Sequence, residues 1–285
     1  MFGKLVRSLR KEHRDADGTQ WTQQILADKA GVDKRTLERI EQGLLRKIDP
    51  DIVLRLVDAL ELTSVEREQF FFASMLLDNS NLASPQSDPE EKLKMLLAML
   101  ASLRLPAMLV DVYADVIAVN SGALHLFDLY DDLVNYPADE PAAHNIMRVI
   151  FARDSRYRTI LGEEWSRNAL HNIRFFRGIT LRYRFHPYFR QTLAALWKLP
   201  AFRLYWERAR VEDGDSTTDS LMYDYHHPNL GPIRYMASSS QLLTRSGTLY
   251  WAIYVPLDER TMTVFQNMVE RYGTDVIQLA AWPKA

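Results

Sequence analysis

Residues 34–39 carry basic side chains at spacings that place them on one side of a helix. Lys34, Arg35 and Arg39 lie opposite the apolar Leu37 on that helix. Lysine and arginine donate hydrogen bonds to guanine O6 and N7 and to phosphate oxygens. The chemistry that these residues offer is therefore recognition of an anionic polymer, and not the making or breaking of a bond.

The residues before this segment predict the elements that would position it. We expect a helix over 22–30 with Thr22 as its N-cap, and a second helix over 34–42 capped by Asp33. Gly31 lies between them and allows a sharp turn, because it adopts positive φ without a Cβ clash. Two helices joined in this way match the geometry that places a recognition helix in the DNA major groove.

The predicted DNA contacts fall into two groups. The second helix is expected to read bases, and Gln23, at the start of the first helix, is expected to meet a phosphate together with backbone N–H groups. Glu38 is acidic, so it either accepts from cytosine N4 or pairs with Lys34 or Arg35. The predicted DNA-binding residues are Thr22, Gln23, Lys34, Arg35, Thr36, Glu38 and Arg39.

Charge is unevenly distributed along the chain. Residues 1–47 hold eleven Lys/Arg and seven Asp/Glu, so this segment carries about +4 and the remainder about −6, within a net charge of −2. Such asymmetry favours a nucleic-acid-binding end on an otherwise acidic protein. A solvated helix surface would carry the same charges, so the charge count alone leaves both interpretations open.

Composition limits the other classes of protein. The chain has 285 residues, 47% hydrophobic and 25% charged, which suits two folded domains. The absence of cysteine excludes disulfides, thiolate metal sites and a thiol nucleophile. No apolar run approaches 18 residues and no secretory signal begins the sequence. We therefore expect a cytoplasmic protein without a membrane span.

Apolar spacing predicts the order of elements. An all-α N-terminal helix-turn-helix domain of five helices is expected over residues 1–78, followed by a polar linker over 79–91. An α+β domain is expected over 92–285, with a hairpin within 106–120, a helical middle over 142–212 and three strands within 219–256. A single antiparallel sheet with helices on one side fits that order.

Aromatic side chains are frequent in the predicted second domain and could line a ligand cavity. Apolar cavities with a few polar groups bind small molecules, although an aromatic residue at regular spacing more often belongs to a core. An elongated, mainly apolar ligand such as a fatty acid would fit, with its acidic head near an arginine. The candidate lining residues are His171, Arg174, Phe175, Phe176, Tyr183, Trp197, Phe202, Arg203, Trp206, Tyr223, His227, Tyr235, Met236 and Trp251.

The sequence does not favour an enzyme or a metalloprotein. His226 and His227 are adjacent on a predicted strand, so they point to opposite faces and cannot hold one ion together. His227, just before Pro228, is expected instead to end the strand by hydrogen bonding. Phosphate-binding glycine loops, H-E-x-x-H and G-x-S-x-G are all missing. We expect no catalytic residues, no metal and no bound cofactor.

The N-terminal segment resembles the lambda-repressor/Cro-like, or XRE, family of helix-turn-helix proteins. The matching positions are Gln23, Leu26, Ala27, Ala30, Gly31, Val32, Thr36, Ile40, Glu41 and Gly43. The resemblance implies that Lys34, Arg35, Glu38 and Arg39 read bases and that Gln23 contacts the DNA backbone. A homodimer on double-stranded DNA is expected, because one recognition helix reads too few base pairs.

The remaining chain resembles MmyB-like bacterial transcription regulators, whose C-terminal domain is PAS-like. The matching positions are Pro106, Ala107, Asn120, residues 202–206, His227, Pro228 and Gly231. The resemblance implies a regulator whose PAS-like domain binds a small molecule. Two alternatives stay open: a domain for protein interaction and dimerisation without a ligand, and a PAS-like domain that holds haem or flavin.

Overall fold

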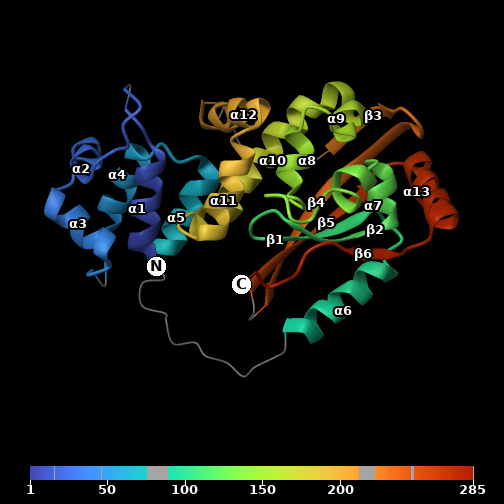
Figure 1. Cartoon of the computed structure of the whole chain (residues 1–285), viewed down its shortest axis with the longest axis horizontal. Coiled ribbons are helices and arrows are strands. Elements are labelled where there is room, and N and C mark those ends of the chain that lie inside the picture. Colours follow the sequence, from blue (N-terminus) through green and yellow to red (C-terminus); the bar gives the residue numbers. More distant parts are fainter. Residues whose placement is uncertain (16, 46, 76–88, 212–221, 245–246, 285) are drawn as a thin grey trace. The chain divides into compact units, whose positions relative to one another are not determined.

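The chain forms two units, each built from segments that are discontinuous in sequence (Figure 1). The computed structural model describes residues 1–15, 17–45, 47–75, 89–211, 222–244 and 247–284. Of these, unit 1 contains residues 1–75, 174–193 and 207–211, and unit 2 contains the rest. The predicted linker 79–91 lies outside the described residues except for its last three positions, which begin a helix.

Five helices form the N-terminal part of unit 1, as the sequence predicts. Both predicted N-caps are confirmed: Thr22 Oγ1 accepts from the backbone N–H of Ile25, and Asp33 Oδ1 from that of Thr36, each at 3.2 Å. Gly31 ends the second helix with φ of 59°, so the turn uses its freedom at positive φ. The helices are α1 (Phe2–Glu12), α2 (Gln23–Ala30), α3 (Lys34–Gln42), α4 (Pro50–Ala59) and α5 (Ser64–Met75).

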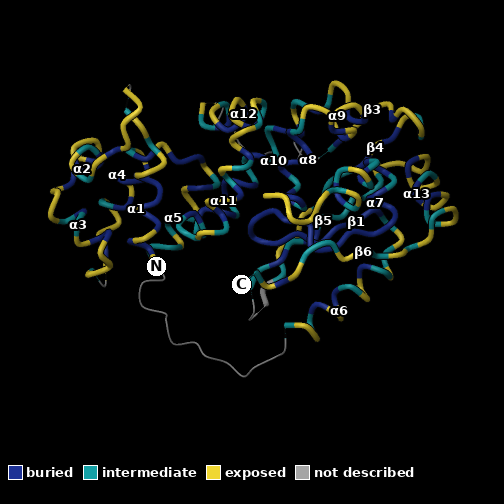
Figure 2. Tube along the Cα trace, in the orientation of Figure 1, coloured by how far each residue is buried: buried dark blue, intermediate teal, exposed yellow. Residues whose placement is uncertain are grey.

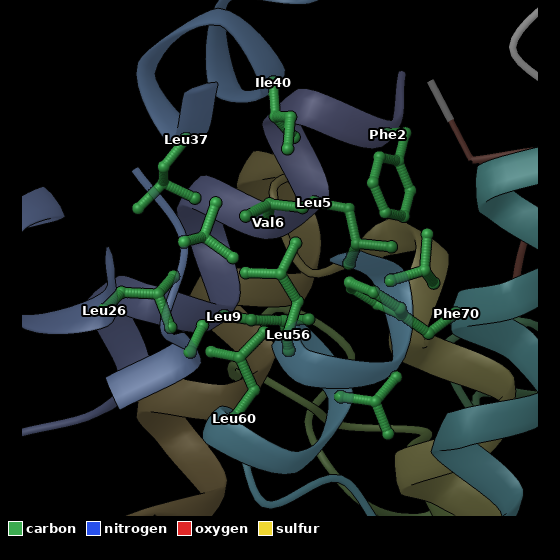
Figure 3. Packing of buried hydrophobic residues seen from close by; sticks show 14 of the residues in the cluster. Phe2, Leu5, Val6, Leu9, Leu26, Leu37, Ile40, Leu56, Leu60 and Phe70 are labelled. Carbon is green, nitrogen blue, oxygen red and sulfur yellow. The ribbon is translucent and has the colours of Figure 1, made fainter. Parts of the chain in front are cut away.

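The apolar sides of these helices meet in one core, shown in Figure 3. Gly3 brings α1 against the backbone of α3, because a Cβ at this position would lie 2.2 Å from the carbonyl oxygen of Ile40. Burial of this set supplies the main driving force for folding the unit. The labelled core residues are Phe2, Leu5, Val6, Leu9, Leu26, Leu37, Ile40, Leu56, Leu60 and Phe70.

Unit 1 also contains a segment from the middle of the chain, residues 174–193. Leu181 is fully buried in the same core as Phe70, and Gly178 lies against Val65 of α5. Sequence position alone would assign this segment to the second domain. Its elements are the end of α10 (Trp165–Thr180), the 3-10 turn η4 (Leu181–Tyr183) and most of α11 (Pro187–Leu196).

A buried ion cluster fixes this segment to the N-terminal helices. The carboxylate of Glu66 in α5, fully buried, accepts from Arg177 Nη2 at 2.9 Å and from Arg184 Nη2. Arg184 Nη1 also donates to Glu12 Oε2 of α1 at 2.5 Å. Burial by itself would raise the pKa of Glu66, but the two guanidinium groups outweigh it and hold that pKa at about 2.

Unit 2 contains a six-stranded antiparallel sheet with strand order β3-β4-β5-β1-β2-β6. It agrees with the α+β PAS-like domain that the sequence predicts, including the hairpin and the three later strands. Strands β1 and β2 are buried along their whole length, as Figure 2 shows. The strands are β1 (Ala107–Asp111), β2 (Val116–Asn120), β3 (Met222–His227), β4 (Gly231–Thr244), β5 (Gly247–Pro256) and β6 (Val276–Gln278).

Helices cover both faces of this sheet, whereas the sequence predicts helices on one side. Leu96 of α6 packs in one cluster with Leu109 and Trp251. Phe127, which ends α7, packs on Tyr254 from the opposite face. The helical elements that contribute to unit 2 are α6 (Pro89–Ser102), α7 (Ser121–Leu126), the π-helical turn η2 (Tyr130–Val134), α8 (Ile146–Phe151), α9 (Arg156–Leu161), η3 (Gly162–Glu164), the start of α10, α12 (Pro200–Val211) and α13 (Glu259–Tyr272).

The strand β6 is the element that the sequence analysis missed. It has three residues and pairs with β2 at the edge of the sheet. A run this short cannot show the alternation that identifies a strand, so only tertiary pairing reveals it.

The ion cluster predicts a large stability effect at Glu66. Glu66→Gln leaves Arg177 and Arg184 buried with one carboxylate fewer, so the free energy of unfolding should fall by about 3 kcal/mol. Urea denaturation of the full chain, followed by circular dichroism, measures this loss. Glu68→Gln, an exposed position in the same helix, should change the free energy of unfolding by less than about 0.5 kcal/mol. If the two variants lose the same free energy of unfolding, the ion cluster does not stabilise the fold.

Candidate functional site

The outer face of α3 carries the predicted base-reading residues. Lys34, Arg35 and Arg39 are exposed, while Thr36 and Glu38 are half-buried. The Glu38 carboxylate lies 4.0 Å from Lys34 Nζ, so the intrahelical pair expected as one alternative is present. Figure 2 marks along the trace of α3 which residues are exposed.

The sequence analysis missed one residue of this face, Gln42. It is exposed and lies one turn beyond Glu38 and Arg39 on the same side of α3. Glutamine can bond adenine N6 and N7 in the major groove. The helical spacing from Arg35 through Glu38 to Gln42 is the signal that could have identified it.

The helix α3 is anchored on its inner side by the buried carboxylate of Glu41. Arg10 of α1 donates to both of its oxygens, from Nε at 2.7 Å and from Nη2 at 3.0 Å. Gln23 of α2 donates from Nε2 to Glu41 Oε2 at 2.8 Å. Three helices therefore meet at one carboxylate, which fixes the orientation of α3 relative to α1 and α2.

The two predicted residues at the start of α2 lie at its N-terminal end. Thr22 is exposed and caps the helix, and Gln23 is half-buried with its amide on Glu41. The first turn of α2 therefore presents its N-terminal end at a fixed position relative to α3. This is the arrangement in which a helix N-terminus can meet a phosphate.

The predicted ligand-binding residues do not form one group. Arg174, Phe175, Phe176 and Tyr183 belong to unit 1. Within unit 2, Trp251 pairs with Ser240, five residues after Tyr235, so the two aromatic side chains point to opposite faces of the sheet. His171 is half-buried on α10, Met236 is half-buried on β4, and Arg203 is exposed on α12.

Two aromatic groups remain in unit 2, and one of them lies on α12 and in the turn that precedes it. Trp197, Phe202 and Trp206 contact one another with ring centroids 5.6–6.0 Å apart. Phe202 also packs on Phe151, and Trp165 on Tyr205, so this group behaves as a local core between helices.

The second aromatic group contains five tyrosines and is called here the tyrosine cluster: Tyr157, Tyr223, Tyr225, Tyr235 and Tyr254. Tyr223 and Tyr235 face each other on adjacent strands with centroids 5.3 Å apart. Tyr254 lies 5.4 Å from Tyr235, and Phe127 lies 5.1 Å from Tyr157. The sequence prediction included only Tyr223 and Tyr235. It left out Tyr225 of the same strand β3, and Tyr254 and Tyr157, which come from β5 and α9.

The tyrosine cluster is polar but uncharged. Burial raises the pKa of Tyr223 to about 12 and that of Tyr225 and Tyr235 further, so all three stay protonated. Tyr157 donates to Asn168 Oδ1 of α10 at 3.1 Å. The hydroxyls of Tyr225 and Tyr235 are near enough to affect each other's pKa. The Tyr223 hydroxyl likewise lies near Asn168, and none of the three hydroxyls has a hydrogen bond of full geometry with a described residue.

His227 ends β3 by hydrogen bonding, as predicted. Its Nδ1 accepts from the backbone N–H groups of Asn229 and Leu230, at 3.1 and 3.2 Å. The proton therefore lies on Nε2, which donates to the carbonyl of Leu126 at 2.9 Å. Across the described ranges, no group of three or more His, Asp or Glu side chains is arranged to hold a metal ion.

A second buried acidic group lies in the β1–β2 hairpin of unit 2. Asp111 Oδ1 accepts from the backbone N–H groups of Tyr113 and Asp115, at 2.8 and 3.0 Å. Asp115 in turn pairs with Lys284 at 2.9 Å. Burial has the largest effect on the pKa of Asp111 and raises it. The nearby charge of Asp115 raises it further, and the charge of Lys284 lowers it, so that the pKa lies at about 8.

This raised pKa predicts a pH-dependent stability. A carboxyl group with a higher pKa in the folded state binds a proton on folding, so its contribution is complete below about pH 4 and is lost as pH rises toward 8. The free energy of unfolding should therefore fall by up to about 1.4 kcal/mol per pH unit between pH 5 and 8. Asp111→Asn should flatten this slope in urea titrations, and Asp154→Asn, an exposed control, should preserve it. Identical slopes in all three proteins would refute the assignment.

Comparison with known proteins matches two parts of the chain to protein families. Residues 2–70 match a helix-turn-helix domain, and residues 93–268 match the MmyB-like transcription regulator ligand binding domain. A comparison with curated proteins finds no match. Over its described residues, the structure has no helix of the length and apolar character needed to cross a membrane. Because the second match spans more than half of the sequence, the chain belongs to the MmyB-like transcription regulators.

Proposed function

We propose that the protein is a sequence-specific regulator of transcription that binds DNA through α3 and responds to a small molecule in unit 2. The observation that carries this proposal is the exposed basic face of α3, held by the contacts of Arg10 and Gln23 to Glu41. A fixed recognition helix needs little reorganisation on binding, so its contacts with bases are made at low entropic cost. The two family matches support the same division of roles.

On DNA we propose a homodimer that reads two half-sites. Arg35 and Arg39 would reach base edges in the major groove, with Gln42 one turn further along the helix. Gln23 and the first backbone N–H groups of α2 would meet a phosphate. Two recognition helices about one DNA turn apart would supply the specificity that one helix lacks. No catalytic step and no membrane is involved, and the cytoplasm is the proposed location.

For the ligand we propose a small, mainly apolar molecule whose polar end meets the tyrosine cluster. Tyr223, Tyr225 and Tyr235 offer hydroxyls that make no hydrogen bond of full geometry with a described residue, although Tyr223 lies near Asn168 and Tyr225 near Tyr235. A buried hydroxyl without a partner costs about 1–3 kcal/mol, so a ligand that bonds these groups recovers that loss. Because the cluster is uncharged, an acyl chain with an uncharged head fits it better than a carboxylate does.

The DNA-binding role predicts the effect of removing one base-reading side chain. Arg35→Ala should weaken binding to a DNA sequence selected from a random pool by roughly 1–3 kcal/mol and relax preference at one base position. Fluorescence anisotropy with the selected and scrambled duplexes measures both effects. Lys94→Ala, which removes an exposed charge from α6, serves as the control and should leave specific binding unchanged. Unaltered selectivity of the Arg35 variant would refute its base-reading role.

The ligand site predicts a discrimination between two probes of equal chain length. Dodecanol should bind more tightly than dodecanoate. Tyr225→Phe combined with Tyr235→Phe should weaken dodecanol binding about tenfold, because two hydrogen bonds are lost. Native mass spectrometry of the full chain measures both affinities and reports any molecule retained on purification. Tyr272→Phe keeps the ring that stacks on His125 and serves as the control. If neither probe binds and no molecule is retained, unit 2 is better explained as a protein-interaction and dimerisation module.

A further inference from the structure

Residues 174–193, called here the clasp, hold two helices of the DNA-binding unit at once. Arg177 and Arg184 both bond the buried carboxylate of Glu66 in α5. Arg184 also bonds Glu12 in α1, and its carbonyl oxygen accepts from Ser8 Oγ at 2.9 Å. The clasp therefore fixes α1 against α5 through side-chain and backbone contacts.

The helix α1 connects the clasp with the recognition helix. Its Arg10 bonds both oxygens of Glu41 in α3. Its Gly3 lies against the backbone of α3, where even a Cβ would clash with the carbonyl of Ile40. The close backbone contact and the bidentate ion pair hold α1 and α3 rigidly together. A displacement of α1 would therefore move or loosen α3.

The clasp comes from the part of the chain that matches the ligand-binding family, not from the part that matches the helix-turn-helix. The two matches cover residues 93–268 and 2–70. The helix α10 begins in unit 2, where Asn168 bonds Tyr157 of the tyrosine cluster, and its last turns, which bear Arg177, belong to unit 1. One continuous helix thus carries a residue of each site.

The two guanidinium groups of the ion cluster, those of Arg177 and Arg184, are balanced by carboxylates when the clasp is closed. Two buried guanidinium groups face two carboxylates, of which Glu66 is fully buried. Withdrawing the arginines would leave Glu66 buried without a cation, which is strongly unfavourable unless water enters. Such a cluster is either closed or opened as a whole, and this all-or-none property suits an element that switches between two arrangements.

We propose that Arg177 and Arg184 are positioning residues for DNA binding: the closed clasp holds α1 against α3 and keeps the recognition helix in its DNA-competent orientation. This inference rests on the proposed DNA-binding function and adds how that function is regulated. A ligand at the tyrosine cluster would act on the clasp through α10. Opening the clasp lowers DNA affinity, and closing it restores that affinity.

The chain offers a direct way to close the clasp covalently, because it contains no cysteine. A Cβ added at Gly178 would lie 3.4 Å from the Cβ of Val65, close to the separation found in disulfides. Val65→Cys combined with Gly178→Cys should therefore form one disulfide on oxidation. Reduction with dithiothreitol returns the same protein to the unlinked state, which supplies a matched control in one sample.

The test measures affinity of the full chain for the DNA sequence that the wild type selects from a random pool. Arg177→Met combined with Arg184→Met should lower that affinity at least tenfold. In the Val65→Cys/Gly178→Cys background, oxidation should restore it to within twofold of the wild type, and reduction should remove it again. Rescue of this kind separates positioning from a direct charge effect of the arginines on DNA, because the disulfide supplies no charge.

A milder variant keeps the test decisive if the double methionine variant does not fold. Glu12→Gln removes a partly exposed partner of Arg184, and it should lower affinity about threefold, with the same rescue by oxidation. Unchanged affinity in the arginine and Glu12 variants, or loss that oxidation does not rescue, would overturn the clasp proposal while leaving DNA binding intact. A wild-type chain that selects no DNA sequence would overturn the proposed function and the clasp with it.

Discussion

The structure depends on keeping one carboxylate, that of Glu66, ionised inside a helical core. Its side chain has no contact with solvent, so without compensation it would be protonated or would destabilise the fold. Two guanidinium groups from residues 174–193 supply that compensation and hold its pKa at about 2. The helix-turn-helix unit is therefore completed by a segment far away in the sequence.

This requirement links the two proposed activities. Arg184 bonds α1, the helix whose Arg10 holds α3, and Arg177 and Arg184 both bond α5. The helix that bears Arg177 also bears Asn168 beside the tyrosine cluster. A regulator needs its two sites to share an element that has two arrangements, because a ligand acts only through its different affinity for them. In this chain α10 carries both Asn168 and Arg177, so we propose that it is the shared element and that the ion cluster is the part that opens and closes.

Local features were predictable from the sequence, and long-range ones were not. The caps at Thr22 and Asp33, the turn at Gly31 and the end of β3 at His227 all follow from contacts within a few residues. The partners of Glu66 lie 111 and 118 residues away, so no spacing rule could pair them. Likewise, the frequency of aromatic residues in the sequence places Trp251 and Tyr235 in one predicted ligand site. Only the strand register shows that their side chains lie on opposite faces of the sheet.

Native-state hydrogen exchange of the full chain in low concentrations of urea tests the central claim most directly. It measures, amide by amide, the free energy of the opening through which each residue exchanges. If residues 176–184 belong to the DNA-binding unit, their amides should share one opening free energy, and one urea dependence, with those of α1 and α5. If they instead exchange together with the strands of unit 2, or open well before α1 and α5, the clasp does not hold the recognition helix and the account is contradicted.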